Sequence, residues 1–145
     1  MCAYRRSIAE SSRSSFSNVL ALKCYARDMS TPKLLLQIEG ALIFLATILF
    51  YRHLQASWLL FAVLFLAPDL FMLGYLVGVR IGAACYNFAH THLTPAALIA
   101  ICFLTTKPIL LPLATIWICH IGFDRMLGFG LKYPTRFNDT HLHHV

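Results

Sequence analysis

The stretch SWLLFAVLFLAPDLFMLGYLVG, residues 57–78, decides the fold of this chain, because it is apolar along nearly its whole length. About 20 apolar residues that rise about 1.5 Å each cross the hydrocarbon core of a bilayer, so the stretch predicts a transmembrane helix. Asp69 lies in its middle, about 16 Å from Trp58 along a helix axis. A carboxylate at that depth is costly unless it is neutral, paired or hydrated, and it therefore marks a candidate functional site.

The composition of the 145-residue chain also favours a membrane protein. Hydrophobic residues make up 59% of it and charged residues only 12%, whereas soluble domains carry about 25% charged residues. The net charge of +6 does not indicate nucleic-acid binding, because the basic residues lie between and beyond the apolar runs. The five cysteines form no CxxC pattern, so we expect free thiols. We therefore expect the lipid bilayer as a partner and no nucleic acid.

Four apolar runs predict an all-α integral membrane bundle of four transmembrane helices. The predicted spans are residues 33–51, 57–78, 81–104 and 108–127, within a domain of residues 29–131. Antiparallel helices joined by such short turns pack as a bundle. With a cytoplasmic N-terminus, ten of the twelve Lys and Arg residues fall on the cytoplasmic side, so both termini are expected there.

The two ends of the chain are polar and are expected to lie outside this domain. Residues 1–28 are basic and serine-rich, which is typical of a disordered extension. Met29 precedes a helix-start signal at Thr31-Pro32 and is the expected natural start. Residues 132–145 predict a short solvated cytoplasmic tail, with the alternative that Asp139 and His141 fold back over the bundle.

Polar residues within the apolar runs form a candidate metal site. Asp69, His90 and His120 lie near one depth, about 12 to 18 Å from a membrane face. Asp124 follows His120 by four residues and lies on the same helical face. Two histidines with one or two carboxylates are a ligand set for zinc, iron or manganese. The four residues Asp69, His90, His120 and Asp124 therefore predict a site for a divalent transition metal.

Two further polar residues are predicted to support these ligands. They are Glu39 in the first run and Asn87 in the third. The spacing i, i+3, i+4, i+7 in the third run predicts one helical face that carries Asn87, His90, Thr91 and Thr94. His92 then points about 200° away from His90 and is not expected to serve the same site.

Three functions are compatible with such a cluster. A bound divalent ion supplies a hydroxide near neutral pH, which favours hydrolysis of a lipid-soluble substrate. Alternatively, Pro68 and Pro95 free backbone carbonyls, which with Asp and His side chains predict a proton or cation path. A single bundle is thin for a transporter, so this alternative implies a homo-oligomer. In the third alternative the polar core only fixes packing in a structural or assembly subunit. The sequence indicates no catalytic triad, so no catalytic residue is assigned.

The chain after Met29 resembles a known family. The signatures that carry the resemblance are LLLQIEGALIF (34–44), FLAPDLFMLGYLVG (65–78), IGAACYNFAHTH (81–92) and ICHIGFDRMLGFGLKYPTRFNDTHL (118–142). They resemble short multi-pass bacterial membrane proteins grouped as domain of unknown function 4260. The resemblance implies a location in the bacterial inner membrane and brings no activity with it, and residues 1–28 depart from the family pattern.

Overall fold

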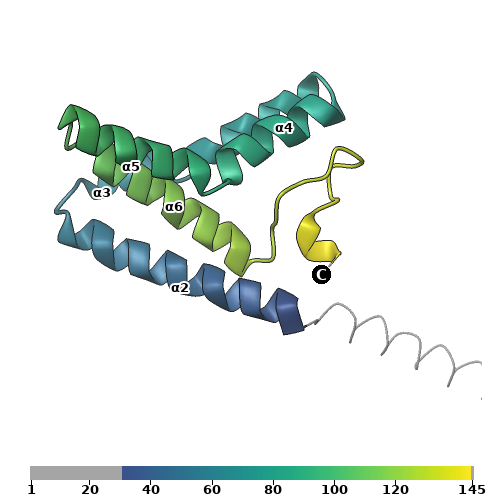
Figure 1. Ribbon diagram of the computed structural model, residues 1–145, viewed down its shortest axis with the longest axis horizontal. Helices are drawn as coiled ribbons and strands as arrows, with labels where there is room; N and C mark the ends of the chain where they lie inside the picture. Colours follow the sequence, from purple (N-terminus) through teal and green to yellow (C-terminus); the bar gives the residue numbers. More distant parts are fainter. Residues whose placement is uncertain (1–30, 145) are drawn as a thin grey trace, which may run out of the picture. The chain divides into compact units, whose positions relative to one another are not determined.

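The regular structure of the described part of this chain is almost entirely helical (Figure 1). The computed structural model describes residues 31–144. In this part of the chain the elements are α2 (Thr31–His53), α3 (Trp58–Leu64), η1 (Ala67–Leu76), α4 (Val79–His90), α5 (Leu93–Thr105), α6 (Leu110–Met126) and η2 (His141–His143). Elements η1 and η2 are 3-10 helices. The predicted all-α class is confirmed here, and the extension predicted for residues 1–28 lies outside the described residues.

Two helical segments are long and apolar enough to cross a membrane. They are Thr31–His53 and Trp58–Leu76, and a third candidate arises if α4 and α5, which are bent by 47°, count as one span. Helix α6 has 17 residues, about 26 Å, which is shorter than a hydrocarbon core of about 30 Å. The described helices therefore provide two or three candidate spans, rather than four clearly delimited ones.

The outer faces of the candidate spans are apolar. Within α2 only Gly40 and Tyr51 are buried. Exposed leucines recur every seven residues along α2, at Leu35, Leu42 and Leu49, and every three residues along η1, at Leu70, Leu73 and Leu76. Seven residues are about two turns of an α-helix and three are one turn of a 3-10 helix, so each set lies on one face. Such continuous apolar faces are typical of contact with lipid.

A proline interrupts the predicted second span. Pro68 has no N–H for the carbonyl of Leu64, and its ring would clash with that carbonyl in a continuous α-helix. Helix α3 accordingly ends at Leu64, and the chain continues from Ala67 as the 3-10 helix η1. Asp69 therefore lies in the first turn of η1 rather than in the middle of an α-helix.

A second proline divides the predicted third span. Pro95 would clash with the carbonyl of Thr91 in a continuous helix, so α4 ends at His90 and Thr91 is extended, with φ −94° and ψ 142°. Pro95 then lies in the first turn of α5, where it is tolerated. The predicted helical face of Asn87, His90, Thr91 and Thr94 is wrong, because α4 ends before Thr91 and Thr94 belongs to α5.

Helix α6 lies at the centre of the helical packing. It contacts α3 and α5, while α4 packs along η1. Figure 1 shows α2 and α6 side by side, and two glycines permit this approach. A Cβ atom on Gly40 would lie 2.6 Å from Arg125 Cβ, and one on Gly122 would lie 2.8 Å from the backbone nitrogen of Phe44. The inward side chains of α6 are therefore enclosed on several sides.

The C-terminal segment packs on the helices instead of forming a solvated tail throughout. Lys132 and Thr140 pair in an isolated antiparallel bridge, and both are buried. Leu142 is fully buried, and Arg125 Nη1 of α6 lies 2.9 Å from His141 Nε2. This arrangement corresponds to the alternative in which the segment folds back over the bundle.

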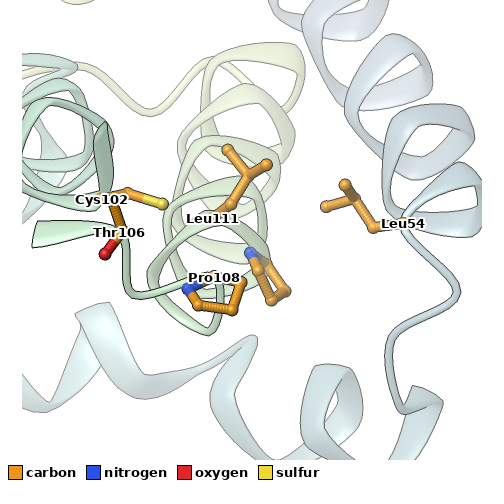
Figure 2. Close-up of a pocket in the computed structure, with 6 residues that line it drawn as sticks. Leu54, Cys102, Thr106, Pro108 and Leu111 are labelled. Atoms are coloured by element: carbon orange, nitrogen blue, oxygen red, sulfur yellow. The ribbon is translucent and has the colours of Figure 1, made fainter.

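A cavity of about 390 Å³ lies where the end of α2, the end of α5 and the start of α6 meet (Figure 2). Its lining consists of Leu54, Cys102, Thr106, Pro108, Leu111 and Pro112. None of these six described residues is a histidine or a carboxylate, and the Cys102 thiol donates to the carbonyl of Lys107 over 3.3 Å. The Cys102 thiol is thus the single potential metal ligand among these six lining residues, too few for a metal site.

Candidate metal centre

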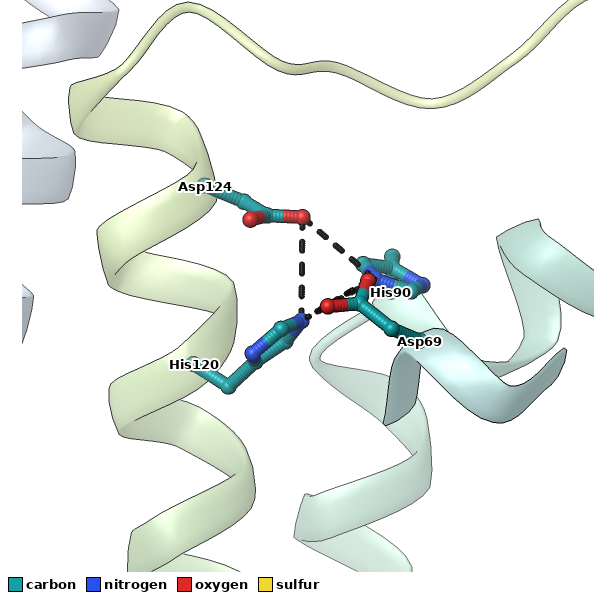
Figure 3. Close-up of side chains that lie close together, drawn as sticks. All are labelled: Asp69, His90, His120 and Asp124. Atoms are coloured by element: carbon teal, nitrogen blue, oxygen red, sulfur yellow. Dashed lines mark hydrogen bonds and ion pairs between the residues drawn. The ribbon is translucent and has the colours of Figure 1, made fainter. Parts of the chain in front are cut away.

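Four ionisable side chains from three elements converge at one point (Figure 3). Asp69 comes from η1, His90 is the last residue of α4, and His120 and Asp124 come from α6. One potential ligand atom of each residue lies within 4.8 Å of those of the other three. The structure thus brings together the four residues that the sequence predicted as ligands, and we call them the His/Asp group.

Five of the six distances between the ligand atoms of the His/Asp group are close to those around a tetrahedral metal ion. His90 Nε2 lies 3.2 Å from His120 Nε2, 3.4 Å from Asp69 Oδ1 and 3.3 Å from Asp124 Oδ2. His120 Nε2 lies 3.5 Å from Asp69 Oδ1 and 3.8 Å from Asp124 Oδ2. Ligand atoms about 2.0–2.1 Å from a central ion are about 3.3 Å apart in a tetrahedron. These five distances suit a tetrahedral metal ion, and the sixth, between the two carboxylate oxygens, lies within 4.8 Å.

The histidines are buried more deeply than the carboxylates. The side chains of His90 and His120 are 3% and 1% exposed, whereas those of Asp69 and Asp124 are 40% and 15% exposed. Two partly desolvated carboxylates at close range repel each other, and a divalent cation between them would offset both charges. The imidazoles thus close the inner side of the group and the carboxylates border its open side.

Tyr86, a residue of α4, contacts two members of the group, His90 and Asp124. Its carbonyl oxygen lies 2.9 Å from His90 Nδ1, which suits donation by the Nδ1–H and leaves the lone pair of Nε2 facing the group. The Tyr86 ring stacks on the His90 ring with centroids 3.7 Å apart, and its hydroxyl donates to Asp124 Oδ2 over 3.2 Å. Support of a ligating histidine by a backbone carbonyl is typical of metal sites.

His120 is supported differently. Its Nδ1 is buried and has no hydrogen-bond partner among residues 31–144. No partner therefore fixes its tautomer from outside the group, and its Nε2 makes all of its contacts within the group. An edge-to-face contact with Phe65, with centroids 5.4 Å apart, holds the ring in position.

The two residues predicted to support the ligands lie elsewhere. Asn87 Nδ2 donates to the backbone carbonyl of Lys132 over 2.8 Å, and its Oδ1 accepts from the Lys132 N–H over 2.7 Å. Glu39 is exposed on α2, outside the His/Asp group. His92 lies outside the group, where the sequence analysis expected it, and it is exposed at the break between α4 and α5 rather than on the far face of one helix.

A cavity of about 790 Å³ opens beside the His/Asp group. The side chains of Asp69 and Asp124 line one part of it and Lys132 lines another. Much of the remaining lining is apolar or aromatic: Met72, Tyr86, Phe123, Leu127, Phe129 and Phe137. The volume lies within the range of about 300–1,000 Å³ that is usual for small-molecule sites.

Lys132 is the notable residue of this cavity that sequence reasoning missed. Its Nζ lies 3.7 Å from the ring centroid of Phe137, 4.4 Å from that of Tyr86 and 5.1 Å from that of Tyr75. Burial lowers the pKa of the Lys132 ammonium, and the negative charges of Asp124 and Asp69 oppose this shift. The ring faces also stabilise the cation. The available signal was the GLKYP signature at 130–134, which places a lysine among apolar and aromatic residues.

Comparison with known proteins establishes a family but no activity. No curated protein and no solved structure matches the chain. A family model described as a domain of unknown function, DUF4260, matches residues 33–145, which include the His/Asp group and Lys132. The match covers more than half of the chain and confirms the resemblance found in the sequence. The chain therefore belongs to the DUF4260 family.

Proposed function

We propose that this protein is a four-span protein of the bacterial inner membrane that binds one divalent transition metal at the His/Asp group. The apolar segments Thr31–His53 and Trp58–Leu76 and the bent pair α4–α5 support three spans, and α6 is the fourth in this proposal. The distribution of Lys and Arg supports placing both termini in the cytoplasm. Zinc, iron and manganese suit a set of two nitrogen and two oxygen ligands.

The surroundings of His90 Nε2 carry the metal proposal. When His90 Nδ1–H donates to the Tyr86 carbonyl, Nε2 of the neutral ring is an acceptor. It nevertheless faces two carboxylate oxygens at 3.4 Å and 3.3 Å, which are acceptors as well. Three acceptors this close need a proton or a cation between them, and a metal ion at tetrahedral distances is a cation that all three atoms can bind at once.

The chemistry that such a centre would support is hydrolysis of a lipid-soluble substrate. A bound divalent ion lowers the pKa of coordinated water to about 7 and so supplies hydroxide. The cavity of about 790 Å³ reaches Asp69 and Asp124, and its largely apolar lining favours an apolar substrate. Tyr86 would hold Asp124 in place through its hydroxyl, and the buried imidazoles would exclude water from the inner side.

Elemental analysis of protein purified in detergent without chelator tests the proposal. We expect about one equivalent of zinc, iron or manganese per chain in the wild type. His90→Ala and His120→Ala should each lose most of it, because an incomplete ligand set binds weakly. His92→Ala is the matched control, since this exposed histidine lies outside the group and should leave the metal content unchanged.

A metal-free wild-type protein that remains folded would contradict the metal proposal. Ion flux into proteoliposomes would then separate the two alternatives. Flux that is lost in Asp69→Asn would support a conducting oligomer, while absence of flux together with lower thermal stability of the variants would support a polar packing core.

A further inference from the structure

We infer that the cavity beside the His/Asp group binds an amphiphile with a singly charged oxyanion headgroup, which bridges the metal ion and Lys132. The inference rests on the proposed function, because the ion forms one half of the headgroup site. Three features of the cavity carry it: the fixed position of Lys132, the charge balance, and the apolar remainder of the lining.

The backbone of Lys132 is held against the same helix that carries His90. Asn87 lies three residues before His90 on α4 and binds both backbone groups of Lys132, over 2.8 Å and 2.7 Å. The bridge between Lys132 and Thr140 holds the segment from its other side. This lysine is therefore an ordered part of the cavity wall, unlike a flexible surface lysine.

Lys132 makes no direct ion pair with the carboxylates of the cavity, although the charges of Asp124 and Asp69 act on it from a longer distance. Among the described residues no ion pair within 4.0 Å joins Lys132 to Asp69 or Asp124, although all three line the same cavity. The Nζ atom contacts ring faces of Phe137, Tyr86 and Tyr75 instead. Ring faces stabilise a cation, but an ammonium still gains from an oxyanion that accepts its N–H groups.

The charge balance selects a singly charged ligand. Two carboxylates, a divalent ion and the Lys132 ammonium sum to a net charge of +1 in the cavity. A phosphodiester or a carboxylate would neutralise this charge. Its oxygens can coordinate the ion and accept hydrogen bonds from the ammonium. A neutral headgroup would leave a buried charge uncompensated.

The rest of the cavity indicates that the ligand carries an apolar chain. Met72, Phe123, Leu127 and Phe129 line it, and its volume of about 790 Å³ exceeds that of a small anion. Met72 belongs to η1, whose outer face carries exposed leucines. A ligand that enters from the lipid could therefore place its headgroup between ion and lysine and keep its chain among apolar side chains.

Native mass spectrometry of the full chain in maltoside detergent tests the inference, because one spectrum reports both bound metal and bound lipid. The main probe is short-chain phosphatidylglycerol, a singly charged phosphodiester. Lys132→Met should bind it about 10- to 100-fold more weakly and retain the metal, because one buried charge-assisted contact is lost. Lys132→Arg should largely restore binding, and Lys107→Met, at an exposed position, should match the wild type.

The outcomes separate the two proposals. A wild type without metal refutes the proposed function, whereas a metal-loaded Lys132→Met that binds the lipid as tightly as wild type overturns the present inference. Inorganic phosphate or a short-chain fatty acid serves as competitor. A fatty acid that displaces the lipid supports a carboxylate headgroup, while phosphate that displaces it at equal concentration overturns the requirement for an apolar chain.

A measurement on the wild type keeps the test valid if Lys132→Met does not fold. In protein loaded with Mn²⁺, the ³¹P signal of bound short-chain phosphatidylglycerol should be strongly broadened relative to protein loaded with Zn²⁺. Equal line widths in the two forms would place the headgroup away from the ion and overturn the inference.

Discussion

Replacing Tyr86 by phenylalanine tests whether Asp124 is a ligand of the proposed metal ion. The Tyr86 hydroxyl donates to Asp124 Oδ2, and its ring stacks on His90. Phenylalanine keeps the ring and therefore the stacking, and removes only the hydroxyl. The same Oδ2 atom lies 3.3 Å from His90 Nε2, so it is the oxygen of Asp124 that faces the centre of the group.

The expected loss of metal affinity is about tenfold. Removal of a residue that supports a metal ligand typically costs about 10- to 100-fold in affinity. The bond from Tyr86 to Asp124 measures 3.2 Å, whereas O–H···O bonds are usually about 2.7–2.8 Å, and the Asp124 side chain is 15% exposed. Water can therefore replace part of the lost hydrogen bond. The expected loss of affinity is thus the lower end of that range, about tenfold or about 1.4 kcal/mol of binding free energy.

Competition with a coloured zinc chelator of known affinity measures this change on the purified protein. Tyr133→Phe is the matched control, because Tyr133 is exposed and lies outside the cavity lining. The control should bind zinc as the wild type does. An unchanged zinc affinity in Tyr86→Phe would refute the placement of Asp124 Oδ2 against the ion.

Three further predictions concern packing, pH and topology. Gly122→Ala should lower the free energy of unfolding by about 1–3 kcal/mol, because the new Cβ atom would lie 2.8 Å from a backbone nitrogen of α2. Gly78→Ala is the control, since a Cβ atom there has no neighbour within 4 Å and should change stability little. Thermal unfolding in detergent measures both variants. Burial lowers the pKa of His141, so its contribution to stability is present above about pH 6.5 and is lost as pH falls below that value. Hydrogen exchange of the C-terminal segment, corrected for its intrinsic pH dependence, should therefore accelerate below pH 6.5 in wild type and not in His141→Gln. Reporter fusions after Val145 and within residues 54–57 should report opposite compartments, and the same compartment for both would contradict the proposed topology.

The convergence of the four residues of the His/Asp group could be predicted because an apolar run restricts where its ionisable groups can lie. An aspartate or a histidine inside an apolar run is stable mainly when it faces the protein interior and finds partners there. Asp69, His90 and His120 were therefore predicted to meet, and the four-residue spacing to Asp124 added the last member. The apolar runs also predicted the helices themselves, with bounds close to those of α2 and α6.

The sequence did not predict the helix breaks at Pro68 and Pro95 or the packing of the C-terminal segment. A proline inside a membrane helix is compatible with a kink as well as with a full break, so Pro68 and Pro95 did not reveal where the helices end. The position of Lys132 depends on its two hydrogen bonds to Asn87, a tertiary contact that no local pattern encodes. A short polar segment likewise gives no periodic signal for the burial of Leu142.

The 3-10 conformation of η1 has a consequence for the length of the segment that carries Asp69. A 3-10 helix rises about 2.0 Å per residue and an α-helix about 1.5 Å, so the ten residues of η1 cover about 20 Å instead of about 15 Å. The segment Trp58–Leu76 then reaches about 33 Å, enough for a hydrocarbon core of about 30 Å. Long 3-10 helices have poor hydrogen-bond geometry, and a thinner bilayer would favour return to the shorter α-helix. If Trp58–Leu76 crosses the bilayer as proposed, the thickness of that bilayer would be coupled to the position of Asp69 relative to the two histidines.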